Sequence, residues 1–513
     1  MRKLERRQIL RNVSSNWIML GINVLVGIFL SPFILHRLGD TAFGIWVLIF
    51  SITGYYGIFD LGIRASVVRY VSRALATNDR AELASVVNTS LFSYSCVGLF
   101  TLLLTLILSA SVDHLFRISP GYHATARWLM LMVGTSVALG FPLGLTGSLL
   151  EGLQRFDIQN GTAIVAILVR AGLTVLVLYQ GRGLLTVALI TVVVPLITSM
   201  VRAVMVLRIC PIPFAWRYVR RATFGSMLNY GGITFLIIIA GRLKFKTDEI
   251  IIGSMMSAAA ITYFNIGARI VDYAGEFVVG LAQIFLPMSS RSDATGNIEE
   301  LRRIFIVGNR FCAIVMFPIC CVLIILGKSV IEVWVGRKYV AYSYPVLVIM
   351  ILCTTVMWSQ GASSRILMGM GRHGTLAIAT LIEGITNVVL SVLLVRPYGI
   401  VGDALGTAIP MVCSMLFFLP GHLCRRLGLR IQTYLRQSYA LPFALCIPLV
   451  MTMLLMQRWF VPHTFLQLTV HLAVAGLVYG AGIAWAYFRN WLTTYSAPLI
   501  ASSFELSGAA AAD

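Results

Sequence analysis

The chain has 513 residues, of which 58% are hydrophobic and only 12% are charged, and its mean hydropathy is +0.87. Soluble domains carry roughly 25% charged residues, so this composition excludes a soluble protein and indicates a membrane protein. The net charge of +20 is spread over many short loops, which membrane topology alone explains, so we expect no nucleic-acid partner.

Apolar runs long enough to cross a bilayer recur along the whole chain. A span needs about 20 residues, and the runs predict about fourteen transmembrane helices: 15–35, 42–63, 85–109, 125–149, 160–180, 184–207, 227–253, 260–287, 304–327, 342–368, 374–395, 400–421, 439–459 and 466–488. With a cytoplasmic N-terminus, most loop Lys and Arg residues fall on the inner side, as the positive-inside rule requires. We therefore predict an all-α polytopic membrane protein with both termini in the cytoplasm.

One short pattern occurs twice and divides the chain into halves. Residues 150–155 and 367–372 share the pattern Leu-x-Gly-x-x-Arg, with six predicted helices between the two copies. Because an even number of helices separates them, the copies share an orientation and indicate a parallel repeat. The predicted parts are a basic cytoplasmic segment (1–14), an N-lobe of helices 1–6 (15–207), a cytoplasmic linker (208–226), a C-lobe of helices 7–12 (227–421), a basic cytoplasmic loop (422–438), helices 13 and 14 (439–488) and a cytoplasmic tail (489–513).

Basic residues interrupt three of the predicted helices. A charge at bilayer depth costs a few kcal/mol and normally faces a protein interior or a water-filled cavity. The residues are Arg170, Arg242, Lys244, Lys246 and Arg269. Arginine keeps its proton and offers forked donors that match phosphate oxygens, so we interpret this set as a binding site for a pyrophosphate or another anionic head group. The alternative is that these cations pair with carboxylates and fix helix geometry, or snorkel to the interface.

Carboxylates accompany these cations in the predicted membrane region. They include Asp248, Asp272, Glu276 and Glu383. A buried carboxylate beside a cation can change its protonation or its ligand with conformation, so we interpret these four as a candidate site for coupling to an H⁺ or Na⁺ gradient. Beyond such an ion we expect no cofactor.

A second charged group lies near the expected cytoplasmic ends of the helices. It consists of Asp60, Arg64, Arg310 and Arg365, and it is a candidate cytoplasmic gate. The alternative is that these residues only anchor the topology, with the arginines snorkelling to the interface.

Catalytic and metal-binding motifs are absent from the sequence. No GxSxG, HExxH, P-loop or GxGxxG motif stands in a credible setting, the seven histidines are dispersed, and the nine cysteines form no CxxC pair. We expect neither an enzyme nor a metal site. Transport would then be driven by an ion gradient, the membrane potential or consumption of the substrate on the far side.

Four segments carry a family resemblance. They are LGDTAFGIW at 38–46, FDLG at 59–62 with Arg69 and Tyr70, DEIIIG at 248–253 followed by Tyr263 and Arg269, and YGIVGDA at 398–404. Over residues 10–490 the chain resembles the polysaccharide flippases of the multidrug/oligosaccharidyl-lipid/polysaccharide exporter superfamily, the Wzx-type O-antigen and capsule group.

The resemblance implies two six-helix bundles around a central cationic cavity, with two further helices at the C-terminus. It also implies alternating access that moves undecaprenyl-pyrophosphate-linked oligosaccharide repeat units from the inner to the outer leaflet of the bacterial cytoplasmic (inner) membrane. The product would be O-antigen, capsule or exopolysaccharide. Partners would be the lipid-linked oligosaccharide, membrane lipids, a polysaccharide polymerase and glycosyltransferases.

Three alternatives stay open at the level of sequence. A lipid II flippase of the same superfamily also moves a pyrophosphate lipid and is compatible with two extra C-terminal helices. A cation-coupled multidrug exporter would need an acidic cavity, whereas the first helix here has Asn23 and no carboxylate. A membrane scaffold for glycosyltransferases would tolerate neutralisation of the buried charges.

Overall fold

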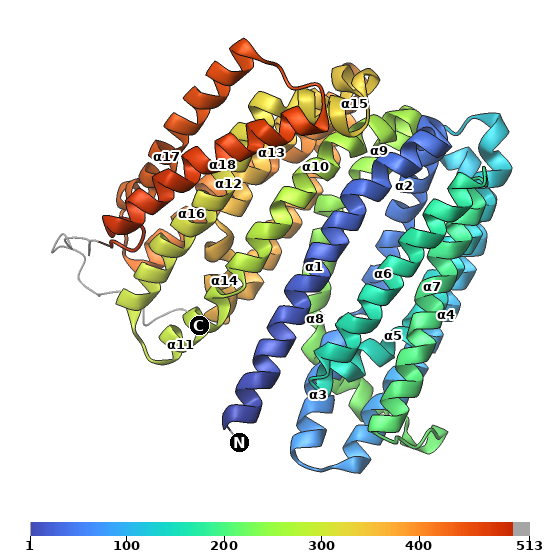
Figure 1. Cartoon of the computed structure of the whole chain (residues 1–513). Helices are drawn as coiled ribbons and strands as arrows, with labels where there is room; N and C mark the ends of the chain where they lie inside the picture. The colour runs from blue at the N-terminus through green and yellow to red at the C-terminus, as the bar shows by residue number, and fades with distance from the viewer. Residues whose placement is uncertain (1, 496–513) are drawn as a thin grey trace. The chain divides into compact units, whose positions relative to one another are not determined.

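The computed structural model describes residues 2–495, which form helices joined by short turns (Figure 1). No residue in this part of the chain lies in a β-strand. The first helices are α1 (Arg2–Leu38), α2 (Asp40–Gly54), the 3-10 helix η1 (Tyr55–Asp60), α3 (Ile63–Ala76), α4 (Arg80–Leu115), α5 (His123–Gly152), α6 (Phe156–Tyr179), α7 (Leu184–Ile209), α8 (Arg221–Phe245) and α9 (Asp248–Met255). They are followed by α10 (Ala258–Ala282), α11 (Phe285–Ala294), α12 (Ile298–Trp334), α13 (Val340–Ser359), α14 (Gly361–Gly369), α15 (His373–Cys413), the π-helix η5 (Ser414–Phe418), α16 (Leu419–Leu427), α17 (Ile431–Trp459) and α18 (Phe465–Phe488). Short 3-10 turns, η2 (Pro120–Tyr122), η3 (Trp216–Tyr218) and η4 (Arg337–Tyr339), lie in the connections.

The number of membrane spans follows from helix length. Among the described residues, 12 helical segments are long and apolar enough to cross a membrane, and the bent α8 brings the number to 13. One segment, Gly374–Leu427, is 54 residues long, which at about 1.5 Å per residue exceeds twice the thickness of a bilayer core. Gly399 interrupts it with φ 59° and ψ −139°, so this segment supplies two spans. The protein is thus a multi-pass all-α membrane protein, and the predicted fold class is confirmed.

The helices pack into two compact units. Unit 1 contains Met1–Tyr273, Val330–Met350 and Ala377–Pro410, and unit 2 contains Ala274–Ser329, Ile351–Leu376 and Met411–Asp513. Each unit therefore combines segments that are distant in sequence, whereas the predicted lobes follow the chain order and stay a prediction. Of the predicted tail (489–513), residues 496–513 lie outside the described part of the chain.

One hydrophobic core of unit 1 lies where α3, α4 and α5 meet near the end of α7 and the start of α8. Its fully buried side chains include Val67, Val87, Leu150 and Met227. The period of three to four residues on each helix directs these apolar groups to one side, as an amphipathic pattern requires. The packing fixes α3 and α8 next to the break between α2 and α3.

The break between α2 and α3 brings two backbones into contact. Leu61 (φ 52°) and Gly62 (φ 74°) are in the left-handed region, where glycine is tolerated best. A Cβ on Gly62 would lie 2.3 Å from the carbonyl oxygen of Gly231 on α8. Glycine at this point thus lets α8 approach the chain at the end of η1.

Proline also shapes α1. Pro32 has no N–H, so the helix leaves the carbonyl of Ile28 without its usual donor four residues on. The indole Nε1–H of Trp334 donates to that carbonyl oxygen at 2.7 Å. A side chain from the end of α12 therefore replaces the missing helical hydrogen bond.

Candidate functional site

The predicted cations of the seventh span lie on a broken helix. α8 bends by 47° between Arg221–Gly232 and Phe235–Phe245, and the helical hydrogen bonding stops again before α9 begins at Asp248. Two consecutive glycines, Gly231 and Gly232, stand at the bend, where a helix is weakest. Irregular backbone at membrane depth is tolerated where it is buried in protein or lines a cavity.

Lys244 and Glu383 form a buried ion pair between α8 and α15. Their side chains are only 4% and 2% exposed. Gly384 permits the approach, because a Cβ there would lie 2.9 Å from the Cβ of Leu243. Asn387, one turn further along α15, donates to the carbonyl oxygen of Lys244 at 3.1 Å. The structure therefore brings together one predicted substrate-binding residue and one predicted coupling residue as partners of each other.

A polar cluster continues from this pair between α9 and the two halves of α15. The Thr407 hydroxyl lies 3.0 Å from Oδ1 of Asp248 and 3.3 Å from Oδ1 of Asn387. The Ser391 hydroxyl lies 2.9 Å from the same Asn387 oxygen and 3.3 Å from the backbone oxygen of Asp403. All five residues are buried. We call this group, Asp248, Asn387, Ser391, Asp403 and Thr407, the oxygen cluster.

The oxygen cluster is rich in acceptors and poor in cations. No hydrogen bond of normal geometry reaches either carboxyl oxygen of Asp403, and Glu249 is buried beside Asp248. Among the described residues, no Lys or Arg forms an ion pair with these three carboxyls. Burying a carboxylate without a partner is costly, so such a group is stabilised by a proton or by a bound cation. No group of three or more His, Cys, Asp or Glu side chains within residues 2–495 has the arrangement of a metal centre.

Arg242 differs from Lys244 in its surroundings. The residue is partly exposed, and its guanidinium lies against the backbone of η1, where a Cβ on Gly57 would stand 2.9 Å from Nη2. The Tyr55 hydroxyl donates to the Arg242 carbonyl at 3.2 Å and also contacts the Thr247 hydroxyl. Arg242 takes part in no ion pair in the part of the chain that the structure describes. Its five donors are therefore available for an anion.

The other predicted cations are distributed over unit 1. Arg269 and Asp272 face each other at 3.9 Å on α10 with 46% and 60% of their side chains exposed, and Arg269 lies over the ring of Tyr273. Glu276 lies one turn further along α10, in unit 2. Lys246 is partly exposed between α8 and α9, and Arg170 is partly buried on α6. The described contacts do not connect Arg170 to the oxygen cluster.

The four predicted gate residues have separate partners. Asp60 accepts a hydrogen bond of 2.6 Å from Tyr94, and Arg64 pairs with Glu151. Both contacts lie in unit 1. In unit 2, Nη1 of Arg365 lies 3.7 Å from Sδ of Met368 on the same helix.

Arg310, the fourth of these residues, is buried in unit 2 and bound entirely by carbonyl groups. Its Nε and Nη2 donate to the Gln437 oxygen at 2.9 and 2.6 Å, and Nη1 donates to the oxygens of Trp491, Leu492 and Thr494 at 2.8 to 2.9 Å. The guanidinium thereby ties the segment after α18 to α12 and to α17.

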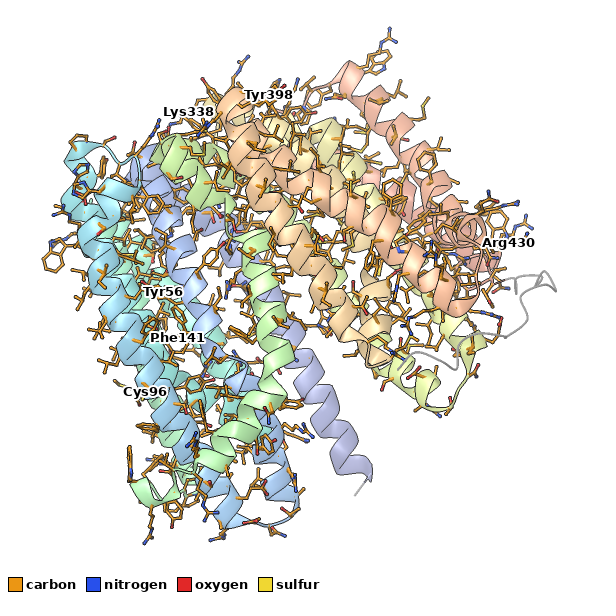
Figure 2. All side chains as sticks on the ribbon, turned by 180° about the vertical axis from the view of Figure 1, so that it is seen from behind. Tyr56, Cys96, Phe141, Lys338, Tyr398 and Arg430 are labelled. Atoms are coloured by element: carbon orange, nitrogen blue, oxygen red, sulfur yellow. The ribbon has the colours of Figure 1, made fainter. Side chains whose placement is uncertain are left out.

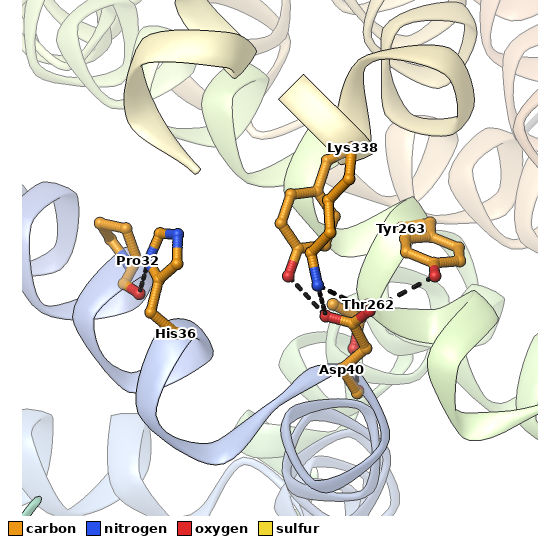
Figure 3. A network of polar contacts seen from close by, with 7 residues as sticks. Pro32, His36, Asp40, Thr262, Tyr263 and Lys338 are labelled. Atoms are coloured by element: carbon orange, nitrogen blue, oxygen red, sulfur yellow. Dashed lines mark hydrogen bonds and ion pairs between the residues drawn. The ribbon is translucent and has the colours of Figure 1, made fainter. Parts of the chain in front are cut away.

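A network that the site prediction did not include surrounds Asp40 at the start of α2 (Figure 3). Lys338 lies 3.1 Å from both carboxylate oxygens, and the Tyr339 hydroxyl donates to Oδ1. The Tyr263 hydroxyl lies 3.4 Å from Oδ2, and the Thr262 hydroxyl donates to the Asp40 backbone oxygen at 2.7 Å. These contacts join the start of α2 to η4 and α10 within unit 1.

The fold is that of the transporters of the MOP superfamily. The lipid II flippase MurJ in an inward closed conformation matches with a TM-score of 0.68 and 15% identity over 94% of this chain and 99% of that one. An inward-facing multidrug-resistance transporter of the MATE family matches with a TM-score of 0.66 and 15% identity over 81% of this chain and 95% of that one.

Residues 34–344 match the family model of polysaccharide biosynthesis proteins, and the chain belongs to this family. It is 23% identical over 415 residues to a protein of Shigella flexneri named as an O-antigen transporter, with 79% of this chain and 95% of that protein covered. It is also 23% identical over 439 residues to the uncharacterized membrane protein EpsK of Bacillus subtilis, with 83% and 85% covered. The predicted family is thereby confirmed.

Proposed function

We propose that this protein is a flippase that moves undecaprenyl-pyrophosphate-linked oligosaccharide repeat units from the inner to the outer leaflet of the bacterial cytoplasmic membrane. It would serve O-antigen, capsule or exopolysaccharide biosynthesis and would work by alternating access, with both termini in the cytoplasm. Membership of the polysaccharide biosynthesis family and similarity to the Shigella protein named as an O-antigen transporter support the proposal. Polymerase and glycosyltransferase partners belong to the same proposal.

The observation that supports binding of a pyrophosphate is that Arg242 has no ion-pair partner among the described residues. A pyrophosphate cannot cross hydrocarbon unaided, so its charge has to be met by fixed donors while the polyprenyl tail stays in lipid. Arg242 offers a guanidinium without an ion-pair partner among the described residues, and this guanidinium lies next to the backbone of Gly57. Lys244 forms an ion pair with Glu383, so we assign it a structural role. Arg242 would make the direct contact with the pyrophosphate.

The experiment measures the amount of lipid-linked oligosaccharide in each leaflet of the membrane, in cells that lack this protein. Wild type is expected to clear repeat units from the inner leaflet, whereas Arg242→Gln leaves them there. Arg425→Gln is the matched control, because Arg425 is exposed on α16 in unit 2 and has no side-chain partner among the described residues. Clearance of the pool by Arg242→Gln would remove this residue from the site. No accumulation in the cells that lack the protein would overturn the proposal.

The lipid II flippase remains the second candidate, because the fold matches MurJ over nearly its whole length. The same cells distinguish the two functions. Accumulation of lipid II with a normal oligosaccharide pool would assign the chain to cell-wall synthesis, and accumulation of the oligosaccharide alone would assign it to polysaccharide export.

We infer that the coupling ion, H⁺ or Na⁺, binds at the oxygen cluster. The buried carboxyls without an ion-pair partner are one reason. The other is the donor set, since carboxylate, amide, hydroxyl and backbone oxygens suit a hard cation. Exchange of the ion would change the charge between α9 and α15 and could thereby bias the two conformations of the cycle.

Sodium and proton dependence of flipping in proteoliposomes tests this assignment. Asp248→Asn is expected to abolish the stimulation by the ion gradient, whereas Asp293→Asn, which changes an exposed carboxylate on α11, should leave it intact. Equal stimulation of both variants would place the coupling site elsewhere. Loss of ion dependence with flipping retained would separate coupling from substrate binding.

A further inference from the structure

Unit 1 contains a pocket beside the basic linker between α7 and α8 that the substrate site does not use. It has a volume of about 420 Å³. Thr89, Phe92, Ser93, Cys96 and Val97 contribute one face of α4, at helical spacings of three and four residues, and Figure 2 labels Cys96 on this helix. The opposite wall comes from the linker and the first turn of α8.

The linker is held against α4 by directed hydrogen bonds. Asn88 donates to the Pro213 oxygen at 2.9 Å and accepts from the Ala215 N–H at 3.1 Å. The Arg220 N–H donates to the Thr89 hydroxyl at 3.1 Å. The pocket is therefore a fixed feature of the structure, because the linker that forms one wall is hydrogen-bonded to α4, which forms the other wall.

The lining of the pocket is almost entirely apolar, although two arginines belong to it. Phe92, Val97 and Phe224 are apolar, whereas Arg220 and Arg221 stand at its margin with exposed side chains. Neither arginine takes part in an ion pair among residues 2–495. A ligand that fits has an apolar part for α4 and an anionic part for two guanidinium groups.

The surroundings of the pocket are those of a membrane interface. Phe214 and Trp216 of the linker are exposed, and the Trp216 ring meets Phe92 edge to face with 4.8 Å between ring centroids. Aromatic side chains of this kind are enriched at the level of lipid head groups. Beyond Cys96, α4 exposes Leu99 and Leu103, so an acyl chain that enters the pocket can continue along the same helix.

We propose that this pocket binds an anionic diacyl phospholipid of the bilayer. The phosphodiester would contact Arg220 and Arg221, and one acyl chain would lie along α4 between Phe92 and Leu103. The bound lipid would cover the start of α8, the helix that carries Arg242, and would thereby fix the position of this end of the broken helix. The site is independent of the proposed transport function.

The test uses the full-length protein in detergent and measures binding of phosphatidylglycerol and phosphatidylcholine by native mass spectrometry. The expected result is preferential binding of phosphatidylglycerol to wild type and an affinity about 30-fold lower in Arg220→Gln/Arg221→Gln, because each of the two arginines contributes about 1 kcal/mol near a lipid surface. Arg425→Gln/Arg426→Gln removes two neighbouring exposed charges from α16 and should leave the binding unchanged.

A second pair of variants tests the pocket itself. Cys96→Phe fills the space and is expected to lower binding of phosphatidylglycerol, whereas Cys413→Phe, the same change at an exposed cysteine in unit 2, is not. If the two double arginine variants lost binding of phosphatidylglycerol equally, the effect would come from the net charge of the protein, and the proposal would be overturned. Displacement of phosphatidylglycerol by undecaprenyl phosphate or by glycerol 1-phosphate at equal concentration would also overturn it, because the first would indicate a substrate subsite and the second a phosphate site.

Discussion

Two arginines within predicted membrane helices, Arg310 in unit 2 and Arg242 in unit 1, have opposite surroundings. Arg310 is buried and donates to the carbonyl oxygens of Gln437, Trp491, Leu492 and Thr494. Arg242 is partly exposed, contacts the backbone of η1 and takes part in no ion pair of the described residues. A guanidinium whose three nitrogens all donate to the protein stabilises the fold, whereas one with free donors can exchange water for a ligand.

The same contrast, between a cation with protein partners and one without them, distinguishes Lys244 from Arg242 on α8. Lys244 is buried and paired with Glu383, and Arg242, two residues earlier, is not paired. The role of a cation in a membrane helix therefore cannot be predicted from its position in the sequence. It depends on which partner the cation has. Substitutions that remove one member of each kind test this distinction.

The largest effect is expected for Lys244→Met. It leaves Glu383 buried without its cation, which typically lowers the free energy of unfolding by about 3–5 kcal/mol. The double variant Lys244→Met/Glu383→Gln should recover most of this loss, because the uncompensated charge is removed. Thermal unfolding in detergent measures both effects. A double variant as unstable as the single one would show that the pair does not act as a unit.

Arg310→Met is expected to lower the free energy of unfolding by about 3 kcal/mol, because several buried carbonyl groups lose their donors and regain water only in part. Arg303→Met on the same helix is the control. Arg303 is exposed and faces Glu300 at 3.9 Å, and such surface pairs contribute about 0–1 kcal/mol. Melting temperatures of the two variants that agree within error would argue against a structural role for Arg310.

Arg242→Gln is expected to leave the melting temperature unchanged and to lower the rate of flipping by about 10- to 100-fold, which corresponds to about 1.4–2.8 kcal/mol. Lysine at this position keeps the charge but loses the forked geometry, so Arg242→Lys should fall between wild type and Arg242→Gln. The measurement is flipping in proteoliposomes at equal protein content. Unfolding of the glutamine variant would assign Arg242 to the same structural group as Arg310.

The smallest effect is expected for Gly57→Ala. The new Cβ would lie 2.9 Å from Nη2 of Arg242, so the flexible end of the arginine has to move, and we expect flipping to fall by about threefold. Gly54→Ala is the matched control, since its Cβ would lie 3.7 Å from Nη1, an ordinary contact distance. Equal activity of both variants would mean that the guanidinium need not hold its position against η1.

The sequence predicted the spans well because hydropathy over about 20 residues determines them. The sequence also identified Arg242, Lys244, Asp248 and Glu383 as charges at membrane depth. It did not predict that Lys244 and Glu383 pair with each other, because the contact depends on the packing of α8 against α15 through Gly384. Such long-range pairings are not encoded in local periodicity.

The oxygen cluster was predicted only in part. Asp248 was identified as a coupling candidate, whereas Asn387, Ser391, Asp403 and Thr407 were not. A signal existed: Asp403 and Thr407 lie four residues apart within an apolar run, as do Asn387 and Ser391, so each pair shares a helix face. The kink at Gly399 could not be predicted from the sequence. It folds the two halves of α15 onto one another, so that the two faces meet.

The proline in α1 has a consequence for spectroscopy. Because Pro32 frees the Ile28 carbonyl and the Trp334 indole fills the gap, the emission of one of the nine tryptophans depends on the position of α1. Retaining Trp334 alone would give an intrinsic fluorophore whose emission maximum shifts when α1 moves away and the indole N–H loses this acceptor. Time-resolved fluorescence of that variant would follow the transport cycle without any attached label.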